Sequence, residues 1–134
     1  MKLTPVILLP VLILFSCGDN TKEENALKND ILQIHDKLMA CDDALMQSKT
    51  KLDSLLKLKT RDSLDLKAID KQVSDADEAM ETWMHQFQPD QTGKSHDEVM
   101  KYYSEQKKQI IAVESQMNAA VASAKKYLST IKSK

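Results

Sequence analysis

Apolar residues recur at alternating intervals of three and four in three blocks that cover most of the chain. The first block, with Ser48 as its one polar member, comprises Leu27, Ile31, Ile34, Leu38, Cys41, Leu45, Leu52 and Leu55. The second comprises Leu66, Ile69, Val73, Ala76, Met80, Trp83 and Phe87. The third, with Gln106 as its one polar member, comprises Val99, Tyr103, Ile110, Val113, Met117, Ala120, Ala124, Tyr127 and Ile131. Side chains at this spacing share one face of an α-helix, so the pattern predicts three long amphipathic helices.

Glycine and proline, on which the turns of sheet proteins depend, are scarce in this chain. Its 134 residues include two Gly and three Pro, and none lies between Asp19 and Gln88 or after Lys94. A sheet protein needs such residues at short intervals. A chain of this length forms one small domain. The sequence therefore predicts an all-α fold in a single domain.

Two interruptions divide the helical blocks. The segment 88–93 contains Pro89 and Gly93 and cannot continue a helix, while Ser95 and Glu98 form a capping box that opens the next one. Near residue 60, Asp62 is a suitable N-cap. We therefore expect an up-down-up three-helix bundle with helices at about 22–58, 62–87 and 96–131. Leu32, Met39 and Met46 widen the first stripe, as a helix with two neighbours requires.

A second architecture fits the same pattern. Lys59 and Asp62 occupy core positions of one unbroken register, so the first two blocks also fit one continuous helix over about 22–87. That very long first helix, with an antiparallel third helix, would need an oligomeric coiled coil to cover its apolar stripe.

The N-terminus has the pattern of an export signal. Lys2 precedes an apolar run over 5–15, which is too short to span a bilayer as a mature helix. The run ends in Leu14-Phe15-Ser16-Cys17, which resembles a bacterial lipobox. The resemblance implies cleavage before Cys17 and acylation of its thiol. We therefore expect a lipoprotein signal peptide at 1–16, a lipidated tether at 17–21 and a helical bundle domain at 22–134.

The residues after Cys17 indicate a destination. Gly18-Asp19-Asn20 and the following Glu23 and Glu24 resemble the acidic stretch of Bacteroidota-type lipoproteins, which implies the outer membrane, facing the periplasm or the cell surface. Removal of Lys2 with the signal leaves 18 basic against 20 acidic side chains. A chain of this charge has no global basic field, so no nucleic-acid partner is expected.

The sequence lacks the common catalytic and cofactor motifs. It contains no phosphate-binding glycine loop, no Gly-x-Ser-x-Gly, no His-Glu-x-x-His and no Cys-x-x-Cys. We therefore expect neither enzymatic activity nor a cofactor. With Cys17 acylated, Cys41 has no intramolecular disulfide partner, and its place between Leu38 and Leu45 predicts a buried thiol.

One end of the expected bundle collects soft metal ligands. A turn at residue 60 places residue 87 opposite 34, with residue 96 near the same level. The side chains that would gather there, together with Met100, are His35, Met39, Cys41, Met80, Met84, His85 and His96. Thioether, thiol and imidazole suit copper(I), although methionine also fills irregular core space. Trp83 and Phe87, four residues apart, are either a contact for a partner or ligand, or a core plug at the bundle end.

The whole chain resembles a family of small bacterial lipoproteins that carry the loose label "viral A-type inclusion protein". The resemblance rests on the lipobox at 14–17, on Ile34-His35-Asp36, and on the segment from Trp83 to Phe87. It implies a helical fold and an envelope location, and no activity. The function expected is a non-enzymatic structural or protein-interaction module that meets a protein partner or a second copy. The alternative is a periplasmic metal or small-ligand binder that uses the methionine- and histidine-rich end.

Overall fold

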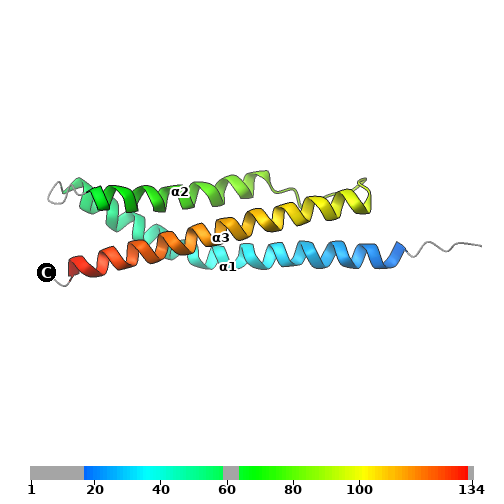
Figure 1. Cartoon of the computed structure of the whole chain (residues 1–134), viewed down its shortest axis with the longest axis horizontal. Coiled ribbons are helices and arrows are strands. Elements are labelled where there is room, and N and C mark those ends of the chain that lie inside the picture. The colour runs from blue at the N-terminus through cyan, green and yellow to red at the C-terminus, as the bar shows by residue number, and fades with distance from the viewer. Residues whose placement is uncertain (1–16, 59–63, 133–134) are drawn as a thin grey trace, which may run out of the picture.

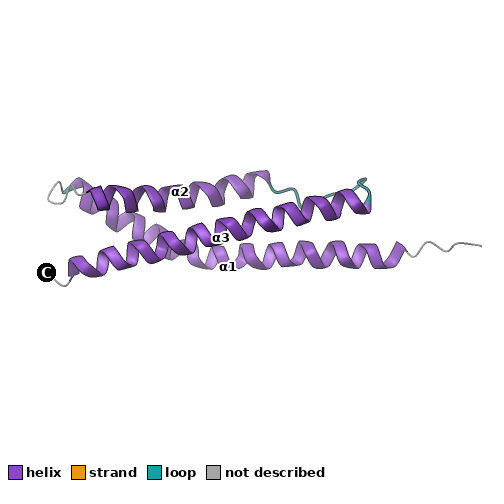
Figure 2. Ribbon diagram, viewed as in Figure 1, coloured by secondary structure: helices purple, strands orange, loops and turns teal. Residues whose placement is uncertain are grey.

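The computed structural model describes residues 17–58 and 64–132 and confirms the all-α three-helix bundle. Helices α1 (Cys17–Lys57), α2 (Leu64–Gln86) and α3 (His96–Lys132) pack against one another, and the described part of the chain contains no strand (Figures 1 and 2). The expected signal peptide at 1–16 and the core positions Lys59 and Asp62 lie outside the described residues.

The helices run up, down and up, so the continuous helix over 22–87 is wrong. Helix α2 is antiparallel to α1, because Trp83 lies against His35 while Ser74 accepts a hydrogen bond from Lys49 Nζ at 2.7 Å. Helix α3 is parallel to α1, because His96 pairs with Glu24 and Lys107 with Asp30. The first stripe is covered within its own chain.

Helix α1 begins earlier than expected. It starts at Cys17 and not near residue 22, so the expected tether over 17–21 forms the first turns of the helix. The segment Lys22–Leu27 consists mainly of good helix formers, and no proline follows before Pro89. Nothing in this stretch ends a helix once it has begun.

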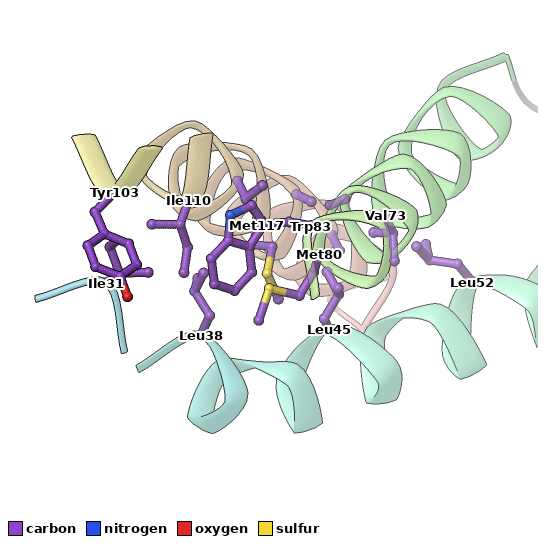
Figure 3. Close-up of a cluster of buried hydrophobic side chains, with 14 of the residues drawn as sticks. Ile31, Leu38, Leu45, Leu52, Val73, Met80, Trp83, Tyr103, Ile110 and Met117 are labelled. Carbon is purple, nitrogen blue, oxygen red and sulfur yellow. The ribbon is translucent and has the colours of Figure 1, made fainter. Parts of the chain in front are cut away.

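The core follows the apolar stripes closely. Helix α1 contributes Ile31, Leu38, Leu45 and Leu52, each buried almost completely. Their side chains meet those of α2 and α3 along one continuous layer, and the labelled residues across from α1 are Val73, Met80, Trp83, Tyr103, Ile110 and Met117 (Figure 3). Ser48 and Gln106, the two polar members of the stripes, are also buried. None of the helices in the described residues is long and apolar enough to cross a membrane.

The connection between α2 and α3 carries its own stabilising bonds. Asp90 accepts hydrogen bonds from the hydroxyl and backbone N–H of Thr92, which lower the pKa of its carboxyl. Gly93 follows with a φ of 85°, in the left-handed region that glycine tolerates. The predicted capping box is confirmed, because the Ser95 N–H donates to Glu98 Oε2 at 2.9 Å and lowers the pKa of Glu98.

This connection does not fold straight back at the end of α2. It continues along the bundle axis, so α3 begins beyond the last turn of α2 (Figure 1). The contacts of Glu24 with His96 and of Asp30 with Lys107 show that the early turns of α1 lie beside the early turns of α3. That part of the bundle consists of two helices, and the rest consists of three.

Candidate functional site

A ladder of aromatic rings closes the three-helix part of the bundle. The indole of Trp83 stacks on Phe87 at a centroid distance of 4.9 Å and lies 6.0 Å from the ring of His35. Phe87 continues to Tyr102 at 6.4 Å. Trp83 is 4% exposed, so it belongs to the core, and Phe87 is half-buried. Of the two interpretations of this pair, the core plug fits the structure and a surface contact through Trp83 does not.

Two tyrosines that the sequence analysis did not single out hold the α2–α3 connection. The hydroxyl of Tyr103 donates to the carbonyl oxygen of Pro89 at 2.9 Å, and the N–H of Gln88 donates to the hydroxyl of Tyr102 at 2.8 Å. Burial is the main cause that raises the pKa of Tyr103. The signal in the sequence is the Tyr-Tyr pair just inside α3, where two adjacent rings reach two faces of the helix.

His96 does not join the other two histidines, so the expected gathering of all three at one end is wrong. His96 Nδ1 lies 2.8 Å from Glu24, His85 lies 3.7 Å from Glu81, and His35 lies 3.3 Å from Asp36. Since α3 begins beyond the end of α2, residue 96 is level with residue 24 and not with residue 34. Ten residues of helix separate these levels by about 15 Å.

The sulfur ligands divide between the core and the surface. Met80 is buried in the core near Met117 and Trp83 (Figure 3). Met39 and Met84 are exposed. Cys41 is half-buried, so the prediction of a fully buried thiol is wrong. Its core position lies at the edge of the stripe, where the packing leaves part of the side chain accessible. Across residues 17–58 and 64–132, no group of three or more His, Cys, Asp or Glu side chains is placed to hold a metal ion.

Apolar side chains that the bundle leaves uncovered form a strip beside the contact between α1 and α2. They are Leu32, Met39, Met46 and Met84, each between 37% and 44% exposed, and we refer to them as the methionine strip. The expectation that the three members on α1 widen the buried stripe is wrong. They follow the fully buried Ile31, Leu38 and Leu45 by one residue, which turns them about 100° away from the core.

The α1 part of the strip borders α2. The residues of α1 that interact with α2 include His35, Asp42 and Lys49. Met39 and Met46 each lie four residues after one of these, on the adjoining part of the helix surface.

Met84 belongs to the same surface from the α2 side. Asp70 and Asp77 precede it by 14 and seven residues, and both interact electrostatically with α1. Residues seven apart share one helix face, so Met84 faces the same border between α1 and α2. Its neighbour Trp83 contacts His35, which places Met84 level with the first part of the strip.

Carboxylates surround the methionine strip. Burial, and then the charges of Asp77 and Asp43, raise the pKa of Asp42. Burial and the charge of Asp53 raise the pKa of Asp70. Asp77 and Asp70 are the α2 carboxylates at this contact. The border of α1 and α2 therefore combines exposed methionine with several carboxylates.

The like charges across the α1–α2 contact predict a stabilising substitution. Because the folded-state pKa of Asp42 is raised, its favourable contribution is complete below the unfolded value of 3.8 and is lost as the pH rises through the folded value. At pH 7 we expect Asp77→Asn to raise the free energy of unfolding by about 0.5 kcal/mol, the scale of partly exposed charge pairs. The gain should shrink toward pH 4, where the carboxyls become protonated. Urea unfolding across this pH range measures it.

The exposed Glu78 supplies the matched control for this test. It is the residue after Asp77 on the same helix, and it lines the groove on the α3 side of α2. Glu78→Gln removes one charge from the same helix and should change the stability far less. An equal gain from both substitutions would show that the net charge of α2, and not its contact with Asp42, is responsible.

Comparison with known protein families, curated proteins and solved structures gives no match for this chain.

Proposed function

We propose that this chain is a non-enzymatic, lipid-anchored protein of the bacterial outer membrane whose helical bundle binds a protein partner through the methionine strip. The anchor rests on the lipobox Leu14-Phe15-Ser16-Cys17 and on the resemblance to envelope lipoproteins. The interaction role rests on one observation, the strip of exposed Leu and Met side chains at the border of α1 and α2.

Methionine suits such a surface because its side chain is unbranched and polarizable. It adapts its shape to an apolar partner, and it is common in binding surfaces whose side chains repack when a partner binds. Three members of the strip recur every seven residues on α1, so they form one line along the helix. A partner helix that lies along α1 would meet them as successive anchors.

The charges around the strip specify the chemistry of the partner. Asp36 and Asp43 are exposed on α1, and Asp42, Asp70 and Asp77 lie at the contact between α1 and α2. The complementary surface has an apolar centre flanked by Lys or Arg, because such a surface neutralises these carboxylates. The association should weaken at high ionic strength.

No comparable observation supports the copper alternative. His35, His85 and His96 each lie beside a different carboxylate, and His96 lies level with Glu24, apart from the other two. The geometry therefore favours the interaction module.

Site-specific photo-crosslinking in envelope preparations tests the proposal. A photoreactive amino acid at position 39 should give one defined adduct, and Leu32→Gln with Met46→Gln in the same chain should reduce its yield at least fivefold. The matched control is Ile111→Gln, because Ile111 on α3 is exposed to a similar degree, 46%, but lies outside the strip. This control should leave the adduct unchanged.

Three outcomes would contradict the interaction role of the strip. They are the absence of a defined adduct, the same adducts from a photoreactive residue at position 111, and an adduct that persists in the double variant. An adduct whose mass is twice that of the chain would identify the partner as a second copy.

A further inference from the structure

A second apolar feature lies at the other end of the bundle, between the later half of α1 and the last turns of α3. It is a groove of about 590 Å³ whose walls are mostly apolar, with Leu55 on one side and Leu128 and Ile131 on the other. Volumes of this size are typical of small-molecule sites, which range from roughly 300 to 1,000 Å³. The groove shares no lining residue with the methionine strip.

The sequence of α1 explains why the groove is open. Ser48 stands at a core position where the stripe otherwise has an apolar residue, and its hydroxyl donates to the carbonyl oxygen of Ala44 at 2.7 Å. Thr50 and Ser54 donate in the same way to Met46 and to Thr50. Such bonds to the preceding turn bend helices. The later half of α1 turns toward α2, and the end of α3 stands apart from it (Figure 1).

The charged side chains that line the groove are all positive. Its lining includes two lysines, Lys51 and Lys125, and no carboxylate. Neither lysine forms an ion pair with any residue in the described parts of the chain. An apolar trough with cationic side chains at its wall complements a molecule with an apolar body and a negative end.

The size of the groove selects among molecules of this kind. One turn of an α-helix, about 10 Å across and 5.4 Å long, fills about 420 Å³, so the groove would enclose little more than one turn. Helices that dock in grooves are held by anchors spread over two or more turns. A single acyl chain is narrower than a helix and occupies less volume for the same length. Because the hydroxyls of Ser48 and Ser54 donate to backbone carbonyls, the lysine ammonium groups remain for the negative end.

We propose that this groove binds one long-chain fatty acid, with its acyl chain along Leu55, Leu128 and Ile131 and its carboxylate at Lys51 and Lys125. A carboxylate fits better than a zwitterionic lipid headgroup, because the cation of such a headgroup would lie near the two lysines and be repelled. This inference is independent of the protein-interaction role, since it rests on different residues at the other end of the bundle.

Photolabelling tests the proposal directly. Palmitate with a diazirine near the end of its chain is irradiated with the full chain in lipid nanodiscs, and the labelled peptides are mapped by mass spectrometry. We expect label within 44–55 and 125–131. Unlabelled palmitate should compete at a concentration at least tenfold lower than methyl palmitate or lysophosphatidylcholine, because both of these lack a free carboxylate.

Substitution of the lysines tests the charged end. The double variant Lys51→Gln and Lys125→Gln should need at least a fivefold higher palmitate concentration for half-maximal labelling. The matched control is Lys37→Gln with Lys101→Gln, which removes one exposed lysine from each of the same two helices outside the groove. Circular dichroism verifies that both variants keep the helical fold. Label spread along all three helices, equal competition by methyl palmitate, or equal effects of the two double variants would overturn the proposal.

Discussion

Leu45→Ala should lower the free energy of unfolding by about 2 to 4 kcal/mol, as is typical when a buried leucine is cut to alanine in a tightly packed core. Leu45 has no exposed surface, and its side chain points into the layer between α1 and the other two helices (Figure 3). The substitution removes apolar contacts and leaves a cavity that neighbouring long helices fill only in part. Small domains have total stabilities of about 5 to 15 kcal/mol, so the loss is a large fraction.

The next residue in the chain gives a matched control. Met46 is 41% exposed, and Met46→Ala should change the stability by about 0.5 kcal/mol or less. Urea unfolding followed by circular dichroism measures both variants. Equal losses at positions 45 and 46 would contradict the described orientation of α1.

Cys17→Ser should abolish acylation. Serine has no thiol to accept the lipid, and the lipobox Leu14-Phe15-Ser16-Cys17 offers no other cysteine. Since each buried methylene contributes about 0.8 kcal/mol to membrane binding, loss of the acyl chains should also remove stable anchoring. Metabolic labelling with an alkyne fatty acid, followed by gel fluorescence, gives a signal for the natural chain and none for the variant.

Cys41→Ser is the control for the anchor, because Cys41 is the only other cysteine in the sequence. The label should remain on that variant at full strength. If Cys17→Ser retains the label, or if Cys41→Ser loses it, the proposed anchor is wrong.

The heptad pattern predicted the helices well because it reports directly on burial. The core positions of α1 from Ile31 to Leu52 are all buried except Ile34 and Cys41. The buried positions include the polar Ser48. The capping box at Ser95 and Glu98 likewise fixed the start of α3 to within one residue, since its bonds are local. Features that depend on neighbours within one or two helical turns can therefore be predicted from the sequence.

The position along the bundle axis at which α3 begins could not be predicted from the sequence. It depends on the path of the connection, which is held by bonds from Tyr102 and Tyr103 to Gln88 and Pro89. Because these contacts are not evident from the sequence, we expected residue 96 near residue 34. The expected gathering of histidines depended on that placement, which is wrong. The methionine strip was missed for a related reason, because a seven-residue spacing does not say which neighbour, if any, covers the side chain.

The first turns of α1, which extend along the bundle beyond the end of α2, act as a spacer once Cys17 is acylated. Fifteen residues separate Cys17 from Leu32, which is about 22 Å of helix, and Met46 lies about 44 Å along the same path. Helix α3 braces this spacer through the contact of His96 with Glu24 and the ion pair of Lys107 with Asp30. With α1 upright on the bilayer, the strip would lie about 22 to 44 Å from the lipid headgroups, within reach of tall or soluble partners and beyond molecules that lie flat on the bilayer.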